Sequence, residues 1–66
     1  MPFNEYVGRT ITLSLSRAMK KYNVSPSDFL NLERVFDEDD EAMTKAIVEY
    51  SPRGYFDVYQ FIQENN

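Results

Sequence analysis

The sequence predicts an all-α fold, a compact bundle of four short helices arranged as two αα hairpins. Apolar side chains recur at helical spacing along most of the chain. Two Ser-Pro pairs mark helix starts, and the stretches that begin there, SPSDFLNLERVF and SPRGYFDVYQFI, share a pattern of apolar positions. Each stretch follows an Ala-Met pair, which indicates one helical hairpin used twice. We expect helices at 4–22, 26–36, 40–50 and 53–63.

A chain of 66 residues predicts one helical domain, 1–66. It has no cysteine and no histidine, so neither a disulfide nor a Cys/His zinc site can stabilise it. A core of this size is marginal, which leaves a homodimer open, although no heptad pattern demands one. The expected core residues are Val7, Ile11, Leu15, Ala18, Met19, Leu32, Phe36, Ala46, Ile47, Val58 and Ile62.

The segment RTITLSLS, residues 9–16, fits two patterns. Ile11, Leu13 and Leu15 alternate with hydroxyl residues, as in a half-buried strand. Val7, Ile11 and Leu15 also follow helical spacing. A lone strand leaves its backbone groups unpaired, so we favour the helix. The alternative is an N-terminal strand, 9–15, followed by helices in a ribbon-helix-helix-like dimer.

The second helix has the best-marked start in the chain. Ser25 is a natural N-cap, Pro26 suits the first helical position, and Asp28 stands where an acid completes a capping box.

The acidic run at 37–41 is expected to open the third helix, with Asp39 or Asp40 as its cap. That helix ends near Ser51, because a residue before proline avoids helical dihedrals. Ser51 and Pro52 then repeat the start signal. The last helix is expected to place Tyr55, Val58, Tyr59 and Ile62 on one stripe.

The composition argues against an enzyme. The chain lacks the commonest general base, histidine, and the strongest nucleophile, cysteine. Its two glycines stand alone, so there is no phosphate-binding loop. The acidic run lacks the spaced ligands and central glycine of a calcium loop, and we expect a solvated helix start there. No cofactor and no metal site are predicted.

Charge and aromatic content favour binding to another macromolecule. Residues 1–34 carry a net charge of +2 and residues 35–66 one of −6. Ten aromatic residues, five Tyr and five Phe, are more than a core of this size can enclose, and tyrosine is enriched at interfaces. We therefore expect a small acidic, non-enzymatic regulatory protein that binds and inhibits another macromolecule, by analogy with those of phages and plasmids. The expected partner is a protein with a basic surface, contacted by Tyr50, Arg53, Tyr55, Tyr59, Asp37, Glu38, Asp39, Asp40 and Glu41.

The alternative function is a sequence-specific DNA-binding repressor or antitoxin. Residues 15–35 resemble a helix-turn-helix unit, with Asn23 at the turn and Val24 as its apolar residue, although Met19 replaces a small residue. Acidic side chains near the phosphates would oppose binding. The resemblance implies DNA contacts by Arg17, Lys20, Lys21, Ser25, Ser27, Asn31 and Arg34.

The order RTITLSLS, a short helix, Asn23-Val24-Ser25 and another helix also resembles a ribbon-helix-helix protein, although the first helix is short for that family. In that family an acidic C-terminal segment suits an antitoxin. The resemblance implies groove contacts by Arg9, Thr10, Thr12 and Ser14.

No secretion signal is evident at residues 1–8, and no apolar run approaches the eighteen residues of a membrane span. We expect a cytoplasmic protein that does not contact a membrane, and the lack of cysteine suits that compartment.

Overall fold

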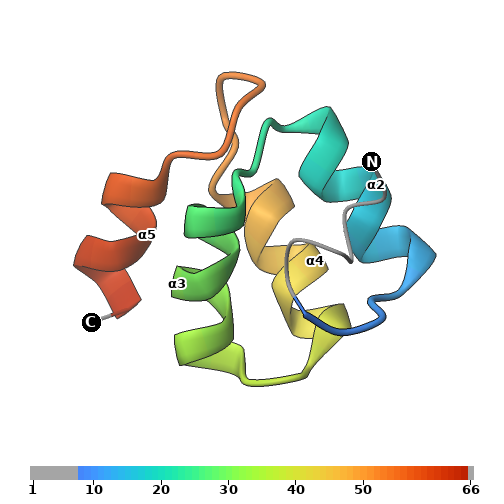
Figure 1. Cartoon of the computed structure of the whole chain (residues 1–66). Coiled ribbons are helices and arrows are strands. Elements are labelled where there is room, and N and C mark those ends of the chain that lie inside the picture. Colours follow the sequence, from blue (N-terminus) through green and yellow to red (C-terminus); the bar gives the residue numbers. More distant parts are fainter. Residues whose placement is uncertain (1–7, 66) are drawn as a thin grey trace.

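Four α-helices account for most of residues 8–65, the part of the chain that the computed structural model describes. The described part contains no strand, so the all-α prediction is confirmed and the alternative strand at 9–15 is wrong. The helices are α2 (Leu13–Lys21), α3 (Pro26–Phe36), α4 (Asp40–Glu49) and α5 (Val58–Asn65) (Figure 1).

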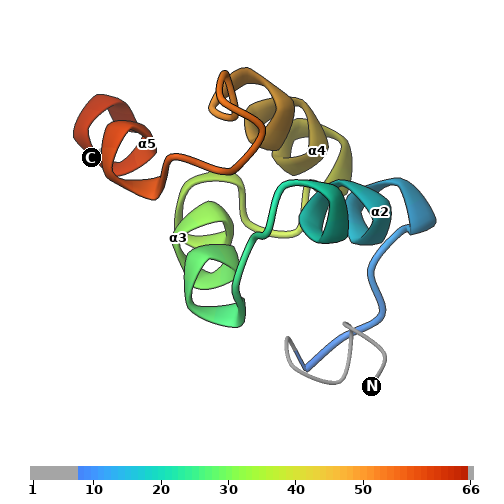
Figure 2. The ribbon, with the colours of Figure 1, turned by 90° about the horizontal axis from the view of Figure 1, so that it is seen from above.

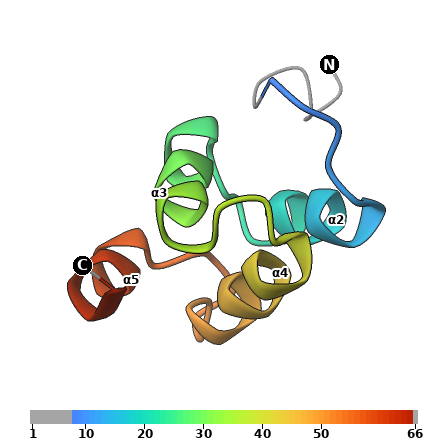
Figure 3. The same cartoon turned by 90° about the horizontal axis from the view of Figure 1, so that it is seen from below.

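The helices form a bundle in which successive elements alternate in direction (Figure 1). The closest packing joins α2 to α4, and α3 contacts both α4 and α5. Views from above and below place α5 and α2 on opposite sides of the molecule (Figures 2 and 3). Helices of one predicted hairpin, α2–α3, therefore pack against helices of the other, α4–α5, and the four helices form one bundle.

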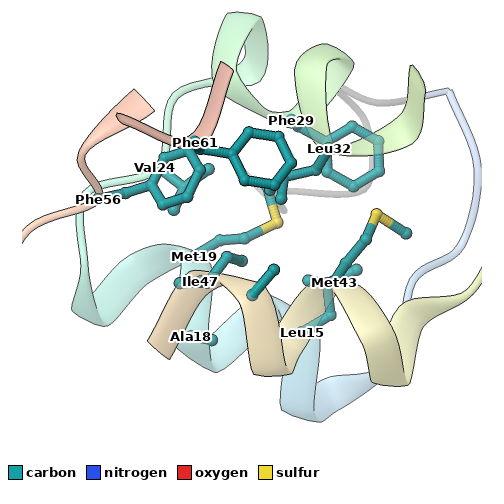
Figure 4. Packing of buried hydrophobic residues seen from close by; sticks show 11 residues of the cluster. Leu15, Ala18, Met19, Val24, Phe29, Leu32, Met43, Ile47, Phe56 and Phe61 are labelled. Carbon is teal, nitrogen blue, oxygen red and sulfur yellow. The ribbon is translucent and has the colours of Figure 1, made fainter. Parts of the chain in front are cut away.

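The core is one cluster of buried apolar side chains drawn from all four helices and from the connecting loops (Figure 4). It contains Leu15, Ala18, Met19, Val24, Phe29, Leu32, Met43, Ala46, Ile47, Phe56 and Phe61. Six of the predicted core residues are confirmed by this cluster. Four others are only partly buried against it, namely Ile11, Phe36, Val58 and Ile62. The predicted core residue Val7 lies outside the described residues.

The first helix is shorter than the predicted 4–22. It begins at Leu13, because the Thr12 hydroxyl accepts a hydrogen bond from the backbone N–H of Leu15 and so caps the helix. The Thr12 N–H is bound in turn by the Asp40 carboxylate at 2.8 Å, which keeps residues 8–12 outside the helix. Residues 4–7 of the predicted helix lie outside the described part of the chain.

The second helix matches its prediction. Ser25 caps α3, its hydroxyl accepts from the Asp28 N–H, and the Asp28 carboxylate accepts from the Ser25 N–H. Pro26 occupies the first helical position. The capping box makes this helix start a local property of the sequence.

The third helix begins at Asp40 as predicted and ends one residue early, at Glu49. Asp39 is its cap, because its carboxylate accepts from the Ala42 N–H. Asp40 lies inside the first turn, where its side chain is free to make other contacts.

The last helix begins at Val58, so the predicted start at residue 53 is wrong. Ser51 is buried and its hydroxyl bonds back to the Ile47 carbonyl of the preceding helix, so it does not cap a new one. Residues 52–57 form a turn in which Gly54 has a φ of +89°, outside the helical region. Asp57 caps α5 instead, accepting from the Gln60 N–H.

The shifted start changes which face of the last helix is buried. Phe61 is fully buried among the rings of Phe36, Tyr50 and Phe56, with ring centroids 5.3–6.0 Å apart. Tyr59, expected on the apolar stripe, points to solvent and is 84% exposed.

Among residues 8–65, no helix combines the length and apolar character that crossing a bilayer requires.

Candidate interaction surface

The acidic run at 37–41 is partly used by the fold itself. Asp39 caps α4, and Asp40 binds Arg9 and the Thr12 backbone. Glu41 forms an exposed ion pair with Lys45 at 3.4 Å. Asp37 and Glu38 remain exposed in the loop before α4, where Asp37 takes a left-handed φ of 55° to end α3. The free acidic surface is therefore smaller than the sequence suggests.

Arg9 joins three parts of the chain. Its guanidinium donates to Glu33 of α3 and to Asp40 of α4, both at 2.6 Å, and lies 5.7 Å from the centre of the Phe29 ring. The hydrogen bond to Asp40 is the main cause of a raised pKa of Arg9. Arg9, one of the groove residues implied by the ribbon-helix-helix resemblance, therefore connects the segment before α2 to α3 and α4. We call the contacts of Arg9 with Glu33 and Asp40 the clamp.

Asp40 is the carboxylate at the centre of this clamp. Burial raises the pKa of Asp40, but hydrogen bonds from Arg9 and from the Thr12 N–H outweigh that effect, and the pKa lies below its ordinary value. The ionised form of Asp40 is the one that the fold requires.

Tyr50 is mainly a packing residue. Its ring meets Phe61 edge to face at 5.3 Å, and its hydroxyl donates to Glu64 and accepts from Asn65. The bond from Asn65 lowers the pKa of Tyr50, but burial and the nearby Glu64 carboxylate raise it, and the pKa lies above its ordinary value. Tyr50 therefore contributes to joining α4 and α5.

The remaining three candidates of the aromatic surface are exposed, Arg53 and Tyr55 in the turn before α5 and Tyr59 in the first turn of α5. The Arg53 guanidinium lies 5.6 Å from the centre of the Tyr55 ring, and its side chain is 3.4 Å from Asp57. Tyr55 is 45% and Tyr59 is 84% exposed. We call Arg53, Tyr55 and Tyr59 the tyrosine surface.

The structure does not join the tyrosine surface and the acidic run into one contact area. The acidic run lies at the start of α4, whereas the tyrosine surface comes after its end, in the turn before α5 and in the first turn of α5 (Figure 1). A helix of ten residues spans about 15 Å, so the two groups lie at opposite ends of α4. The single aromatic and acidic surface expected from the sequence is two separate surfaces.

Some of the residues expected to contact DNA in a helix-turn-helix unit are engaged within the fold, and others are exposed. Asn23 adopts the left-handed conformation (φ 56°) and Val24 is buried, as the turn of such a unit requires. The Ser25 hydroxyl is engaged in the capping box, and the Asn31 amide donates to the Ser27 carbonyl. Five candidates keep exposed side chains, namely Arg17, Lys20 and Lys21 on α2 and Ser27 and Arg34 on α3.

Further exposed apolar side chains escaped the sequence analysis, because exposure on a helix depends on its packing partners. Leu13, Leu30 and Val48 are more than half exposed, and each lies on a different helix. They are dispersed singly, as on most protein surfaces.

An open hollow of about 420 Å³ lies between the start of α2 and α4. The Thr12 hydroxyl in its wall serves as the helix cap, and the Thr44 hydroxyl donates to the Asp40 carbonyl. Among the described residues, no group of three or more acidic side chains is placed to hold a metal ion. The hollow therefore presents neither a pair of catalytic carboxylates nor a set of metal ligands.

The fold and these surfaces define the chain as a small all-helical protein with an exposed aromatic turn. Comparison with protein-family models, with curated proteins and with solved structures gave no match.

Proposed function

We propose that the chain is a small non-enzymatic regulatory protein that binds another protein through the tyrosine surface and inhibits it. The observation that carries the proposal is the exposure of Tyr55 and Tyr59 on either side of the helix cap Asp57, with Arg53 stacked on Tyr55. Tyrosine and arginine are the residue types that most often dominate binding energy at protein interfaces.

The turn is suited to present these side chains in a fixed arrangement. The Phe56 ring between them is buried in the core, and its N–H donates to the Tyr22 carbonyl at 2.8 Å. The Asp57 N–H donates to the Tyr50 carbonyl at 2.7 Å. A preorganised contact loses little conformational entropy on binding, which favours affinity.

The exposed acids Asp37, Glu38 and Glu41 have a different role in this proposal. They lie away from the tyrosine surface, so they act at long range and attract a basic partner. Such charges raise the association rate at low salt more than they raise affinity.

The experiment compares capture of a partner from a lysate of the source organism by the wild type, by Tyr55→Ala/Tyr59→Ala and by Leu30→Ala. Leu30 is the matched control, an exposed large apolar residue on another helix. We expect the double variant to lose the captured protein by at least 10-fold, with an unchanged melting temperature, and the control to keep it. Undiminished capture by the folded double variant contradicts the proposal.

A further inference from the structure

The outer face of α2 carries a concentrated positive charge in an acidic protein. Arg17, Lys20 and Lys21 are all exposed, and at 100° per residue they project within an arc of about 100°. The opposite face of α2 is buried, through Leu15 and Met19. We call Arg17, Lys20 and Lys21 the basic face.

The basic face is not neutralised within the described residues. None of its three side chains forms an ion pair there, whereas Arg9, Lys45 and Arg53 each do. Helix α2 contains no acidic residue. The acidic run lies beside the other end of α2, since Asp40 binds Thr12. The negative charge of the acidic run therefore lies near the start of α2, and the positive charge of the basic face lies toward its end.

The residue types of the basic face favour nucleic acid over a protein as its binding partner. Protein interfaces are depleted of lysine and gather around buried aromatic or apolar anchors. Two of the three residues of the basic face are lysines, and the one neighbouring aromatic ring, that of Tyr22, is half-buried and lies 5.3 Å from the Lys21 Nζ. Long cationic side chains that need no fixed geometry are suited to phosphate oxygens.

We propose that the basic face binds the phosphate backbone of double-stranded DNA, independently of base sequence. The absence of base readout is part of the proposal: of the α3 candidates, the Ser25 hydroxyl and the Asn31 amide already hold backbone partners, and only Ser27 and Arg34 keep exposed side chains. The turn at Asn23 places α3 directly after the basic face. DNA contact by this face is additional to protein binding by the tyrosine surface.

The probe is a fluorescein-labelled 20-base-pair duplex of mixed sequence, titrated with the full chain by fluorescence anisotropy. Three phosphate contacts predict a slope of about −2.7 for log affinity against log salt, hence about a 40-fold loss between 50 and 200 mM salt. A second duplex of unrelated sequence is expected to bind within about 3-fold of the first.

The test variant is Arg17→Gln/Lys20→Gln/Lys21→Gln, because glutamine keeps the helix propensity and removes the charge. Its control is Lys45→Gln, which removes an exposed cation outside both the basic face and the tyrosine surface. We expect the test variant to lose DNA binding at 50 mM salt and the control to retain it. Equal losses in the two variants overturn the proposal, as does the absence of wild-type binding at 50 mM salt.

Lys20 and Lys21 also lie in the last turn of α2, where cations favour the helix dipole. If the triple variant melts at a lower temperature, Arg17→Gln alone is measured, and the slope is expected to weaken by about 0.9. An unchanged slope in that variant overturns the proposal. Preference for a polyglutamate peptide over the duplex assigns the face to an acidic protein, and preference for the matching RNA duplex assigns it to RNA. Either outcome overturns the proposal.

Discussion

Asp40 shows how one side chain can serve two distant parts of a small chain. Its two carboxylate oxygens bind the Arg9 guanidinium at 2.6 Å and the Thr12 N–H at 2.8 Å. The Asp40 side chain is only 10% exposed, so its bond with Arg9 is partly shielded from water, whereas the bond from Thr12 lies at the surface. Bonds to a shielded charge contribute more to stability than exposed ion pairs do.

We expect Asp40→Asn to lower the free energy of unfolding by about 1–3 kcal/mol at pH 7. The pKa of Asp40 is lower in the folded chain than its value of about 3.9 in an unfolded chain. Its stabilisation is therefore complete above about pH 4 and is lost as the pH falls through the folded pKa. Urea unfolding between pH 7 and pH 2 should show a weaker acid dependence in Asp40→Asn than in the wild type.

Glu41→Gln is the control, because that side chain is 82% exposed and its ion pair with Lys45 lies at the surface. We expect a change within about 0.5 kcal/mol. Equal stability of Asp40→Asn and the wild type would show that the clamp contributes nothing.

At the scale of the elements, the two Ser-Pro pairs behave differently. The Ser25 hydroxyl accepts from the Asp28 N–H and opens α3, whereas the Ser51 hydroxyl donates back to the Ile47 carbonyl and caps no new helix. The residue three positions after each serine decides whether a helix starts there. Asp28 completes a capping box, but the matching position holds Gly54, whose φ of +89° turns the chain away from a helix.

We expect Ser25→Ala to lower the free energy of unfolding by about 1 kcal/mol, because the N–H of Asp28 loses its acceptor. Ser27→Ala is the matched control two residues later, and its exposed side chain predicts a change below about 0.5 kcal/mol. Thermal unfolding followed by circular dichroism measures both. A loss in Ser27→Ala as large as that in Ser25→Ala would contradict the assignment of the cap.

At the scale of the whole molecule, a backbone hydrogen bond and the core together join the turn before α5 to the end of α2. The Phe56 N–H donates to the carbonyl of Tyr22, which lies at the end of α2. The Phe56 ring enters the same cluster as Phe61. The turn that carries the tyrosine surface is therefore part of the global fold.

We expect the amide of Phe56 to exchange with deuterium only through global unfolding, at a rate like that of the core amides of α4. The amides of Arg53 and Tyr55 lie in the exposed part of the turn and are expected to exchange much faster. Hydrogen exchange followed by NMR measures all of these amides in one sample. Fast exchange at Phe56 would show that the turn opens independently of the core.

The sequence by itself determined the helical class, the limits of α3 to the residue and those of α4 to within one. These features depend on local chemistry: caps, a proline at the first helical position and apolar spacing. It also determined the absence of a histidine or cysteine site. Charge patterning located the acidic run and the cations of α2, since both are visible without any knowledge of packing.

Only the tertiary structure decided the ends of the first and last helices and the division of the expected binding surface. The first helix is limited by a bond from Asp40, 28 positions after Thr12. The last helix starts only at Val58, because the Phe56 N–H is bound to the carbonyl of Tyr22, 34 positions earlier, and this start leaves Phe61 buried and Tyr59 exposed. The acidic run and the tyrosine surface separate because a rigid helix stands between them. Each result depends on which distant groups come into contact, and local propensity does not specify that.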